Sequence, residues 1–428
     1  MINYLDRSIV LVMRIGLTIR YDHIETMYQS GLRIHLLTED PTAASDPRFA
    51  SVRLLPKETT TETLVEEILL ELKNTGSAYA LTFLEIDIVA VGLANQRHGV
   101  AWARPDADRI ARDKSLQRAH LRDSGLPTPL SLPVGDDSDV EAILDRIGPK
   151  FVVKPTRASS SAKVELVDRR ERAQELFDEI RAIAHSNHSH FYDDGMPEAW
   201  ALVEEFLPGD EITADGVVVD GRFYLGGVNT KQLPHPPGFE EDLYVLPYPD
   251  PVEEQAIAEL MQALVDSLGV KMAIVNAELR RDSQGEFRFV EFSTRISGGH
   301  VYRHIRDVHA VDLVHIFLVA GFGDTDEAHA LAGNRHPGRL ATCIKFLYRT
   351  GVLEHNAPGL AARDPHFRRY YAIARPGQDV WAAPEGYDPV ALLSVWGPYE
   401  KDRHPEAIIE IAQRMEGELD LQVRPFDS

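Results

Sequence analysis

Hydrophobic positions in the N-terminal part of the chain alternate between two spacings, one typical of strands and one typical of helices. Apolar runs at 8–13, 32–37 and 78–84 favour β-strands, whereas the apolar residues of 61–73 recur at helical spacing. Strands that alternate with helices predict a parallel sheet covered on both faces. No G-x-G-x-x-G motif follows the first strand, so we expect no dinucleotide site there.

The middle of the chain has the pattern of antiparallel hairpins instead. Runs at 211–219 and 222–228 meet at Asp220-Gly221, a dipeptide typical of tight hairpin turns. A second hairpin is predicted from 273–280 and 286–292. Helical spacing predicts further helices at 21–30, 89–98, 112–124, 171–184, 252–268, 311–321 and 405–416. We therefore expect a mixed α/β (α+β) fold with about two to four domains or lobes.

The composition narrows the class of function. The formal net charge is −22, from 45 Lys and Arg against 67 Asp and Glu, which argues against a nucleic-acid partner. The single cysteine, Cys343, fits a reducing compartment, so we expect a cytoplasmic location. No apolar run approaches the roughly 18 residues of a membrane helix. The run at 9–13 is too short for a signal peptide, so we expect no membrane partner.

Two lysines on separate elements are candidates for binding a triphosphate. Lys154 ends an apolar strand immediately before Pro155, and the small-residue loop 158–162, which contains Ser159, Ser160 and Ser161, follows it. An ammonium is a compact charge, and the backbone of a small-residue loop can approach phosphate oxygens closely. Lys114 lies in a polar helix upstream. The alternative is that both lysines are solvated surface charges.

A set of carboxylates surrounds a turn near the middle of the chain. Glu204 and Glu205 end an apolar strand, Phe206-Leu207 follows, and Glu211 comes after the Pro208-Gly209 turn. Carboxylates there suit the amino group of adenine and the hydroxyls of ribose, while the apolar pair suits the face of the base. The alternative is a charged strand end that faces water.

The second predicted hairpin carries a candidate metal site. Glu278 and Glu291 lie in its two strands, and paired strands can present both side chains on one face. Two such carboxylates with phosphates nearby favour Mg²⁺. Ser293 faces the same side as Glu291, and so does Arg295 if the strand extends that far; its guanidinium suits a substrate carboxylate or an acyl phosphate. The alternative is an exposed hairpin held by salt bridges.

Taken in order, these motifs resemble the ATP-grasp superfamily of carboxylate–amine ligases, closely over about residues 110–320. The matching motifs are Lys114, Gly125-Leu126-Pro127-Thr128-Pro129, Lys154-Pro155, the serine loop, Glu204-Glu205-Phe206-Leu207-x-Gly209-x-Glu211, Glu278 and Glu291-x-Ser293. Lys154-Pro155-Thr156, Ala158-Ser159-Ser160 and Glu291-x-x-x-Arg295 are most similar to the L-amino acid (dipeptide) ligases of the bacilysin-biosynthesis type. Many members of the superfamily carry Asn where Ser293 stands, and some dipeptide ligases carry His where Asn276 stands, so no amino-acid preference is carried over.

The resemblance implies an architecture and a set of roles. It implies an ATP-grasp fold, with an N-terminal parallel α/β domain at 1–112 and two lobes that sandwich the nucleotide, a small lobe at 113–200 and a large lobe with a C-terminal extension at 201–428. For the nucleotide, it implies that Lys114, Lys154, Ser159, Ser160 and Ser161 bind the phosphates of ATP, that Glu204 and the backbone of Glu205, Phe206 and Leu207 contact adenine, and that Glu211 binds the ribose. For the metal, it implies the ligands Glu278, Glu291 and Ser293. For the substrate, it implies contacts from Asn276, Arg295, Gly298 and Gly299, with Lys154 and Arg295 as the catalytic residues.

The implied activity is ATP-dependent formation of an amide bond between amino acids through an acyl phosphate, with release of ADP and phosphate. Its cofactors would be ATP and Mg²⁺, with Mn²⁺ as an alternative, its partners small carboxylate and amine substrates, and its assembly a homodimer. Two other functions stay open. One is a carboxylase or purine-pathway ligase that uses bicarbonate or a nucleotide precursor, and the other is a non-catalytic nucleotide-binding protein.

Histidines form the remaining candidates. His300 and His304 lie near the predicted site and are candidates for the base that deprotonates the amine, but a lone histidine is more often structural, so neither is assigned to catalysis. His185, His188 and His190 form a short tract for which an exposed loop is a better interpretation than a metal site.

Overall fold

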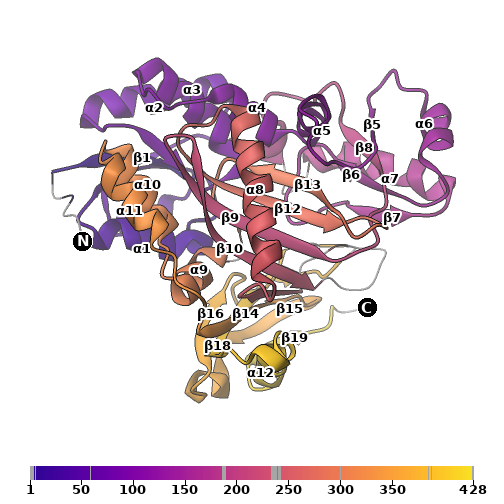
Figure 1. Ribbon diagram of the computed structural model, residues 1–428. Helices are drawn as coiled ribbons and strands as arrows, with labels where there is room; N and C mark the ends of the chain where they lie inside the picture. Colours follow the sequence, from indigo (N-terminus) through magenta and orange to yellow (C-terminus); the bar gives the residue numbers. More distant parts are fainter. Residues whose placement is uncertain are drawn as a thin grey trace.

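The computed structural model describes residues 4, 6–57, 59–185, 189–232, 239, 242–298, 300–383, 385–386 and 388–426. Its strands form a four-stranded sheet β3-β2-β1-β4, a four-stranded sheet β5-β8-β6-β7, an eight-stranded sheet and a small three-stranded sheet (Figure 1). Among the described residues, no helix combines the length and apolar character needed to cross a membrane.

The first sheet is parallel, as the alternating pattern predicts. Its strands are β1 (Ser8–Val12), β2 (Arg33–Thr38), β3 (Phe49–Leu54) and β4 (Ala80–Thr82). Its helices are α1 (Tyr21–Gln29), α2 (Thr61–Thr75) and α3 (Ile88–His98). Every residue of β1 is buried. The strand β3 was not predicted, because it lies at the edge of the sheet and none of its side chains is fully buried.

The helix predicted at 112–124 forms as α5 (Lys114–Asp123), and a helix that was not predicted, α4 (Pro105–Arg112), precedes it. They separate at Asp113, whose carboxylate accepts a hydrogen bond from the Ser115 N–H at 3.0 Å and caps α5. Lys114 is therefore the first residue of a helix rather than an interior one.

The second four-stranded sheet is antiparallel. It contains β5 (Ser131–Val134), β6 (Phe151–Pro155), β7 (Glu165–Val167) and β8 (Ala201–Glu205), with helices α6 (Val140–Ile147) and α7 (Arg170–Ala182). Because β8 pairs with β5 and β6, this sheet continues to Glu205, beyond the expected lobe boundary at residue 200. The division into domains itself stays a prediction.

The eight-stranded sheet has the order β13-β12-β9-β10-β11-β14-β18-β16. Its strands are β9 (Glu211–Val219), β10 (Arg222–Gln232), β11 (Leu243–Leu246), β12 (Ala273–Arg281), β13 (Phe287–Ser293), β14 (Leu340–Leu347), β16 (Phe367–Ala372) and β18 (Ala391–Pro398). Both predicted hairpins form, as β9–β10 and β12–β13. The C-terminal part thus extends the central sheet by three strands.

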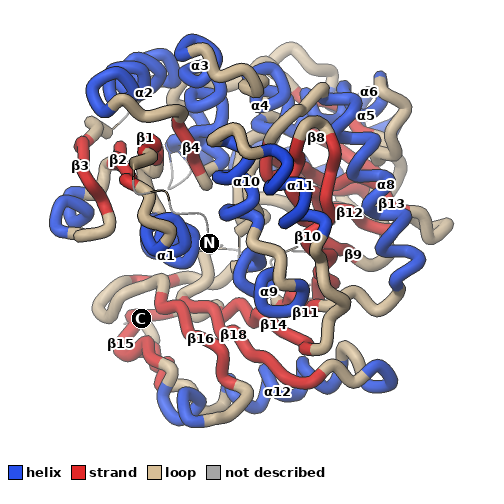
Figure 2. Tube along the Cα trace, turned by 60° about the vertical axis from the view of Figure 1, so that its left-hand side comes forward, coloured by secondary structure: helices blue, strands red, loops and turns tan. Residues whose placement is uncertain are grey.

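Helices cover both faces of this sheet. The helix α8 (Pro251–Leu268) lies along one face over β9 and β10 (Figure 1). The opposite face packs against α9 (Val301–His309), α10 (Leu313–Gly321) and the N-terminal sheet in one continuous core. Near α10 lies α11 (Thr325–Gly333), while β15 (Gly351–Ala357), β17 (Asp379–Val380), β19 (Asp420–Arg424) and α12 (Glu406–Glu416) complete the C-terminal part (Figure 2).

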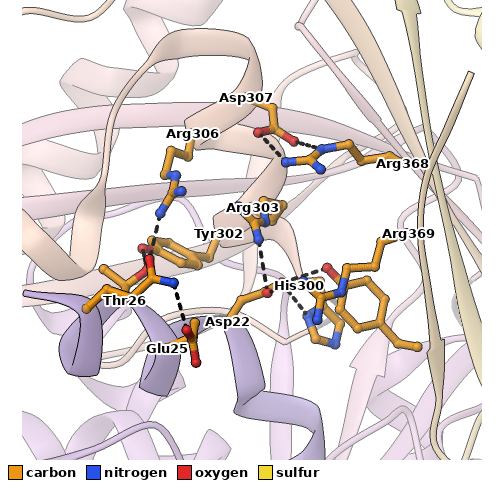
Figure 3. A network of polar contacts seen from close by, with 12 residues as sticks. Asp22, Glu25, Thr26, His300, Tyr302, Arg303, Arg306, Asp307, Arg368 and Arg369 are labelled. Carbon is orange, nitrogen blue, oxygen red and sulfur yellow. Dashed lines mark hydrogen bonds and ion pairs between the residues drawn. The ribbon is translucent and has the colours of Figure 1, made fainter.

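A buried carboxylate ties the N-terminal domain to this core. Asp22 of α1 accepts hydrogen bonds from Arg303 at 3.1 Å, from Arg369 at 2.9 Å and from the Tyr371 hydroxyl at 2.6 Å (Figure 3). Burial raises the pKa of Asp22, but His300, Tyr371 and the two arginines outweigh it and hold the pKa well below its usual range. Asp22 therefore joins α1, α9 and β16 while it remains ionised.

Replacing Asp22 tests the strength of this link. The substitution Asp22→Ala leaves two guanidiniums without their shared acceptor, and we expect the free energy of unfolding to fall by about 3 kcal/mol. Because the folded-state pKa is depressed, this stabilisation is present above the ordinary Asp pKa and is lost as the pH falls below it. Urea unfolding at neutral and acidic pH measures both effects. The control is Asp137→Ala, an exposed turn residue; equal losses for the two variants would contradict the link.

Candidate active site

A cavity of about 760 Å³ is lined by all the main parts of the chain. This volume lies in the range typical of small-molecule sites. The N-terminal domain contributes Gly16, Arg20 and Glu85; the second sheet and its loops contribute Lys154, Ser159, Ser160, Ser161 and Glu204; the large sheet contributes Glu211, Glu278, Glu291 and Ser293; and the C-terminal part contributes Phe346, Tyr348 and Trp381.

The register of the large sheet brings the predicted metal residues to one face. Glu278 lies directly opposite Glu291 across the β12–β13 pair, and Asn276 lies opposite Ser293. Residues two apart on a strand share a face, so these four side chains lie on the same side of the sheet. All four line the cavity.

Each of the two paired glutamates has a lysine partner. Lys114 Nζ lies 3.1 Å from Glu291 Oε1, and Lys231 Nζ lies 3.2 Å from Glu278 Oε1. Burial alone would raise the pKa of Glu291, but Lys114 and Lys154 outweigh it and lower the pKa. Lys231 was missed in the sequence, because it lies on β10 beyond the predicted strand end at residue 228. It lies opposite Glu211, with Nζ 2.6 Å from Oε1.

This pair of carboxylates fits Mg²⁺ better than a metal held by protein alone. Among the described residues, no group of three or more His, Cys, Asp and Glu side chains is placed to hold an ion. Mg²⁺ commonly takes one or two carboxylates and completes its shell with phosphate oxygens and water. Glu278 and Glu291 supply two carboxylates on a cavity wall, so the residues present suit a metal that arrives with a phosphate ligand.

Lys154 belongs to a buried cluster of three charges. Its Nζ lies 2.6 Å from Glu204 Oε2, and Arg118 Nε donates to Glu204 Oε1 at 2.6 Å. Burial, Arg118 and Lys114 lower the pKa of Lys154 to about 8, although Glu204 opposes the shift. Burial raises the pKa of Glu204, but Arg118 and Lys154 bring it to about 2. Two cations thus share one carboxylate at the wall of the cavity.

Arg118 was also missed in the sequence. It lies four residues after Lys114 on α5, and residues at this spacing share one helix face. Both residues are buried. The sequence signal that could have identified Arg118 was its position on the same helix face as Lys114.

The serine loop has an unusual backbone. Ser160, Ser161 and Lys163 have φ of 56°, 53° and 58°, a left-handed conformation that residues with a side chain adopt at a cost. Lys114 Nζ donates to the Ala158 carbonyl at 3.1 Å, which ties the loop to α5. Strain of this kind is common in segments that close over a ligand.

The expected adenine and ribose residues line the same cavity. Both oxygens of the Glu204 carboxylate are already used by Arg118 and Lys154, and Glu205 Oε1 accepts from the Leu130 N–H at 2.9 Å. Glu211 pairs with Lys231 and, at 3.4 Å, with Arg280. The Phe206 ring lies 5.6 Å from the Arg280 guanidinium carbon, and Leu207 is buried. Their roles toward a base and a ribose stay predictions.

Arg295 is held by a glutamate that the sequence analysis did not consider. Arg295 Nε lies 2.7 Å from Glu85 Oε2, which also accepts from Ser293 Oγ at 2.7 Å. The other oxygen, Glu85 Oε1, is buried and has no donor among the described residues. Glu85 follows β4 closely, and ligands in open α/β sheets bind beyond the carboxyl ends of the strands. That position was the signal that could have identified it.

The remaining expected substrate residues lie beside Arg295. Asn276 Nδ2 donates to the Arg295 carbonyl at 3.2 Å, so it shapes the turn after β13. Gly298 lines the cavity, and Gly299 lies outside the described residues. The candidate histidines are elsewhere: His300 stacks on Tyr371 at 3.5 Å, and His304 contacts Ser394 at 2.5 Å. Neither lines the cavity, and burial lowers the pKa of His304 to about 3.

The structure describes His185 and His190 of the histidine tract. His188 lies outside the described residues. His190 lies 3.5 Å from Glu39 and 3.7 Å from Asp193, so its neighbours are carboxylates that also surround Arg14. Cys343 is fully buried in β14.

Comparison with known proteins places this geometry in a family. The sequence profile of the ATP-grasp domain matches residues 147–303. The chain contains an ATP-grasp domain. This segment runs from just before the strand that carries Lys154 to the start of α9, and so includes Glu278, Glu291 and Arg295.

Curated proteins similar to this chain include amino-acid ligases. Over 304 residues it is 25% identical to the alanine–anticapsin ligase of Bacillus subtilis (strain 168), an alignment that covers 66% of this chain and 62% of that ligase. It is 26% identical over 241 residues to carnosine synthase 1 of Homo sapiens, covering 53% of this chain and 28% of the synthase. The matched region thus spans less than two thirds of each relative.

Solved structures agree on the fold. The L-amino acid ligase from Bacillus licheniformis superposes with a TM-score of 0.82 at 16% identity, covering 98% of this chain and 99% of that one. Phosphoribosylglycinamide synthetase from Anaerococcus prevotii superposes with a TM-score of 0.70 at 11% identity, covering 98% and 100%. At these identities the likeness concerns the fold alone, and it confirms the ATP-grasp fold expected from the sequence.

If Lys154 binds the phosphates of a nucleotide, its depressed pKa predicts that nucleotide affinity depends on pH. The protonated amine attracts phosphate, so we expect affinity to be full below about pH 8 and to fall as the pH rises through this value. Calorimetric titration with a non-hydrolysable ATP analogue across this range measures the effect. In the control Lys154→Arg, the guanidinium stays protonated, so its affinity should change little. Identical pH profiles for the two proteins would rule out Lys154 as the titrating group.

Proposed function

We propose that this protein is an ATP-dependent carboxylate–amine ligase that joins two amino acids through an amide bond and releases ADP and phosphate. The observation that carries the proposal is the convergence of Lys114, Lys154 and Arg295 with Glu278 and Glu291 on one cavity. Cations for phosphate, carboxylates for a metal and a guanidinium for a substrate are the groups that such a reaction requires. The names of the relatives support the same class of substrate.

The proposed reaction has two steps. A carboxylate oxygen of the first amino acid attacks the γ-phosphorus of ATP, which forms an acyl phosphate and releases ADP. The neutral amine of the second amino acid then attacks the acyl carbon, phosphate leaves, and the amine loses a proton. Phosphoryl transfer depends mainly on positioning and on neutralising charge. Lys114 and Lys154 would bind the phosphates, and Arg295 would hold the acyl group.

The metal would be Mg²⁺, with Mn²⁺ as the alternative. Glu278 and Glu291 would hold it, with Ser293 beside them. Bound there, the ion would neutralise phosphate charge during the transfer. Lys114 and Lys231 already offset the charge of these carboxylates. Lys114 and Lys154 also lower the pKa of Glu291, which keeps Glu291 ionised and able to act as a ligand.

The nucleotide and the substrates would occupy neighbouring parts of the cavity. We propose that Ser159, Ser160 and Ser161 close over the phosphates. The base would lie against the Glu204, Glu205, Phe206 and Leu207 segment and the ribose near Glu211. On the substrate side, Asn276, Gly298 and Gly299 would shape the pocket around Arg295. The free oxygen of Glu85 is an acceptor for a substrate ammonium. A homodimer stays a prediction.

Substrate-dependent release of ADP tests the proposed function. The protein is incubated with ATP, Mg²⁺ and pairs of amino acids, and ADP, phosphate and new amides are measured by coupled assay and mass spectrometry. The proposal predicts equimolar ADP, phosphate and amide. ADP formation with bicarbonate and no amino acid would support a carboxylase instead, and ATP binding without turnover on any substrate would support a nucleotide-binding protein.

A single metal carboxylate should be essential for turnover. In Glu291→Gln the side chain keeps its size but loses its charge, and we expect the rate to fall at least about 100-fold while the unfolding temperature changes little. Coupled ADP release and thermal unfolding provide the measurements. The matched control is Glu286→Gln, an exposed glutamate at the other end of the same hairpin, which should keep the wild-type rate. Substantial activity in Glu291→Gln would remove this residue from the metal site.

A further inference from the structure

Arg20 is a buried arginine whose charge has no counter-ion among the described residues. It ends a 3₁₀ turn at Leu17–Arg20, is 6% exposed and lines the cavity. One guanidinium nitrogen donates to the Ser297 carbonyl at 2.7 Å, and no described carboxylate forms an ion pair with it. Burial and the nearby Arg295 lower the pKa of Arg20 to about 9.

Other buried arginines of the chain differ in this respect. Arg14 lies 2.7 Å from Asp87, and Arg118 lies 2.6 Å from Glu204. A buried guanidinium without a carboxylate is costly, because its desolvation is not repaid by a partner. Asp215 and Glu85 are near enough to favour the charged form of Arg20, yet neither pairs with it. The remaining side open to an anion is the cavity.

The position of Arg20 indicates which anion it meets. The charged groups nearest to Arg20 are Arg295, Asp215 and Glu85. The two lysines proposed for the phosphates have other partners, because Lys114 contacts Glu291 and Lys154 contacts Glu204. Arg20 thus lines the cavity in a different set of contacts, and we assign a different anion to it.

Amide formation between two amino acids involves two carboxylates with different fates. One is phosphorylated and becomes the acyl group, while the other belongs to the amine-bearing substrate and keeps its charge throughout. A fixed guanidinium away from the phosphates suits the second one, because charge-assisted hydrogen bonds to a carboxylate position the attached amine without taking part in the transfer.

We propose that Arg20 binds the free carboxylate of the amine-bearing amino acid, and so selects amino acids over simple amines as the second substrate. This inference rests on the proposed ligase function. It gives the N-terminal domain a direct role in substrate choice, since Arg20 precedes α1 and reaches the cavity from that domain.

The test compares an amino acid with its carboxamide as the second substrate, using the amino-acid pair that the wild-type protein joins fastest. We expect the wild type to prefer the acid in kcat/KM by about 10- to 100-fold. The variant Arg20→Met, which keeps an unbranched side chain but not the guanidinium, should lose this preference through a raised KM for the acid, with KM for ATP unchanged. Arg20→Lys should retain part of it.

The control Arg33→Met removes an exposed arginine of the same domain and should behave as the wild type. Should Arg20→Met fail to fold, the wild-type comparison and Arg20→Lys still decide the matter. A wild type that uses the amide as well as the acid overturns the proposal.

A second measurement separates this inference from the proposed function. Hydroxylamine replaces the second amino acid, attacks the acyl phosphate of the first, and releases phosphate as a hydroxamate forms. We expect Arg20→Met to form hydroxamate at the wild-type rate, because this amine has no carboxylate. An equal loss with hydroxylamine would show that Arg20 serves the first substrate and would overturn the assignment. A wild type that forms neither ADP nor hydroxamate with any amino acid would overturn the ligase function itself.

Discussion

Pairing of buried opposite charges is the constraint on which this cavity depends. Lys154 and Arg118 come from a strand and a helix that are distant in sequence, and both meet the single carboxylate of Glu204. Two cations therefore share one anion within this buried group of three residues. A polyanionic ligand, such as the nucleotide proposed above, would reduce the electrostatic cost of that arrangement.

Along a single strand of the large sheet, the residues that line the cavity are polar and the residues that pack in the core are apolar. On β9 the residues that share one face are polar near the cavity, at Glu211, Thr213 and Asp215, and apolar further on, at Val217 and Val219. The apolar end joins the core formed with the N-terminal sheet and α10. Burial of that end fixes the strand register, and the register then determines which polar groups face one another in the cavity.

The N-terminal part of the chain both binds to the central core through Asp22 and contributes residues to the cavity. Asp22 is held by Arg303, Arg369 and Tyr371 of the central core, and Arg20, two residues earlier, reaches the cavity. Glu85, beyond β4 of the same domain, holds Arg295. Arg20 and Glu85 therefore both reach, from this part of the chain, the cavity that Glu278 and Glu291 also line.

The sequence by itself determined the parallel N-terminal sheet, the two hairpins and the motif order that resembles ATP-grasp ligases, because local periodicity and turn residues encode them. It also identified Lys114, Lys154, Glu278, Glu291 and Arg295, which line one cavity or contact residues that do. Only the tertiary structure revealed Arg118, Lys231, Glu85 and Arg20. The residues that contact these side chains lie far away in the sequence. Whether a charged side chain has a counter-ion therefore depends on tertiary contacts, which no local sequence pattern encodes.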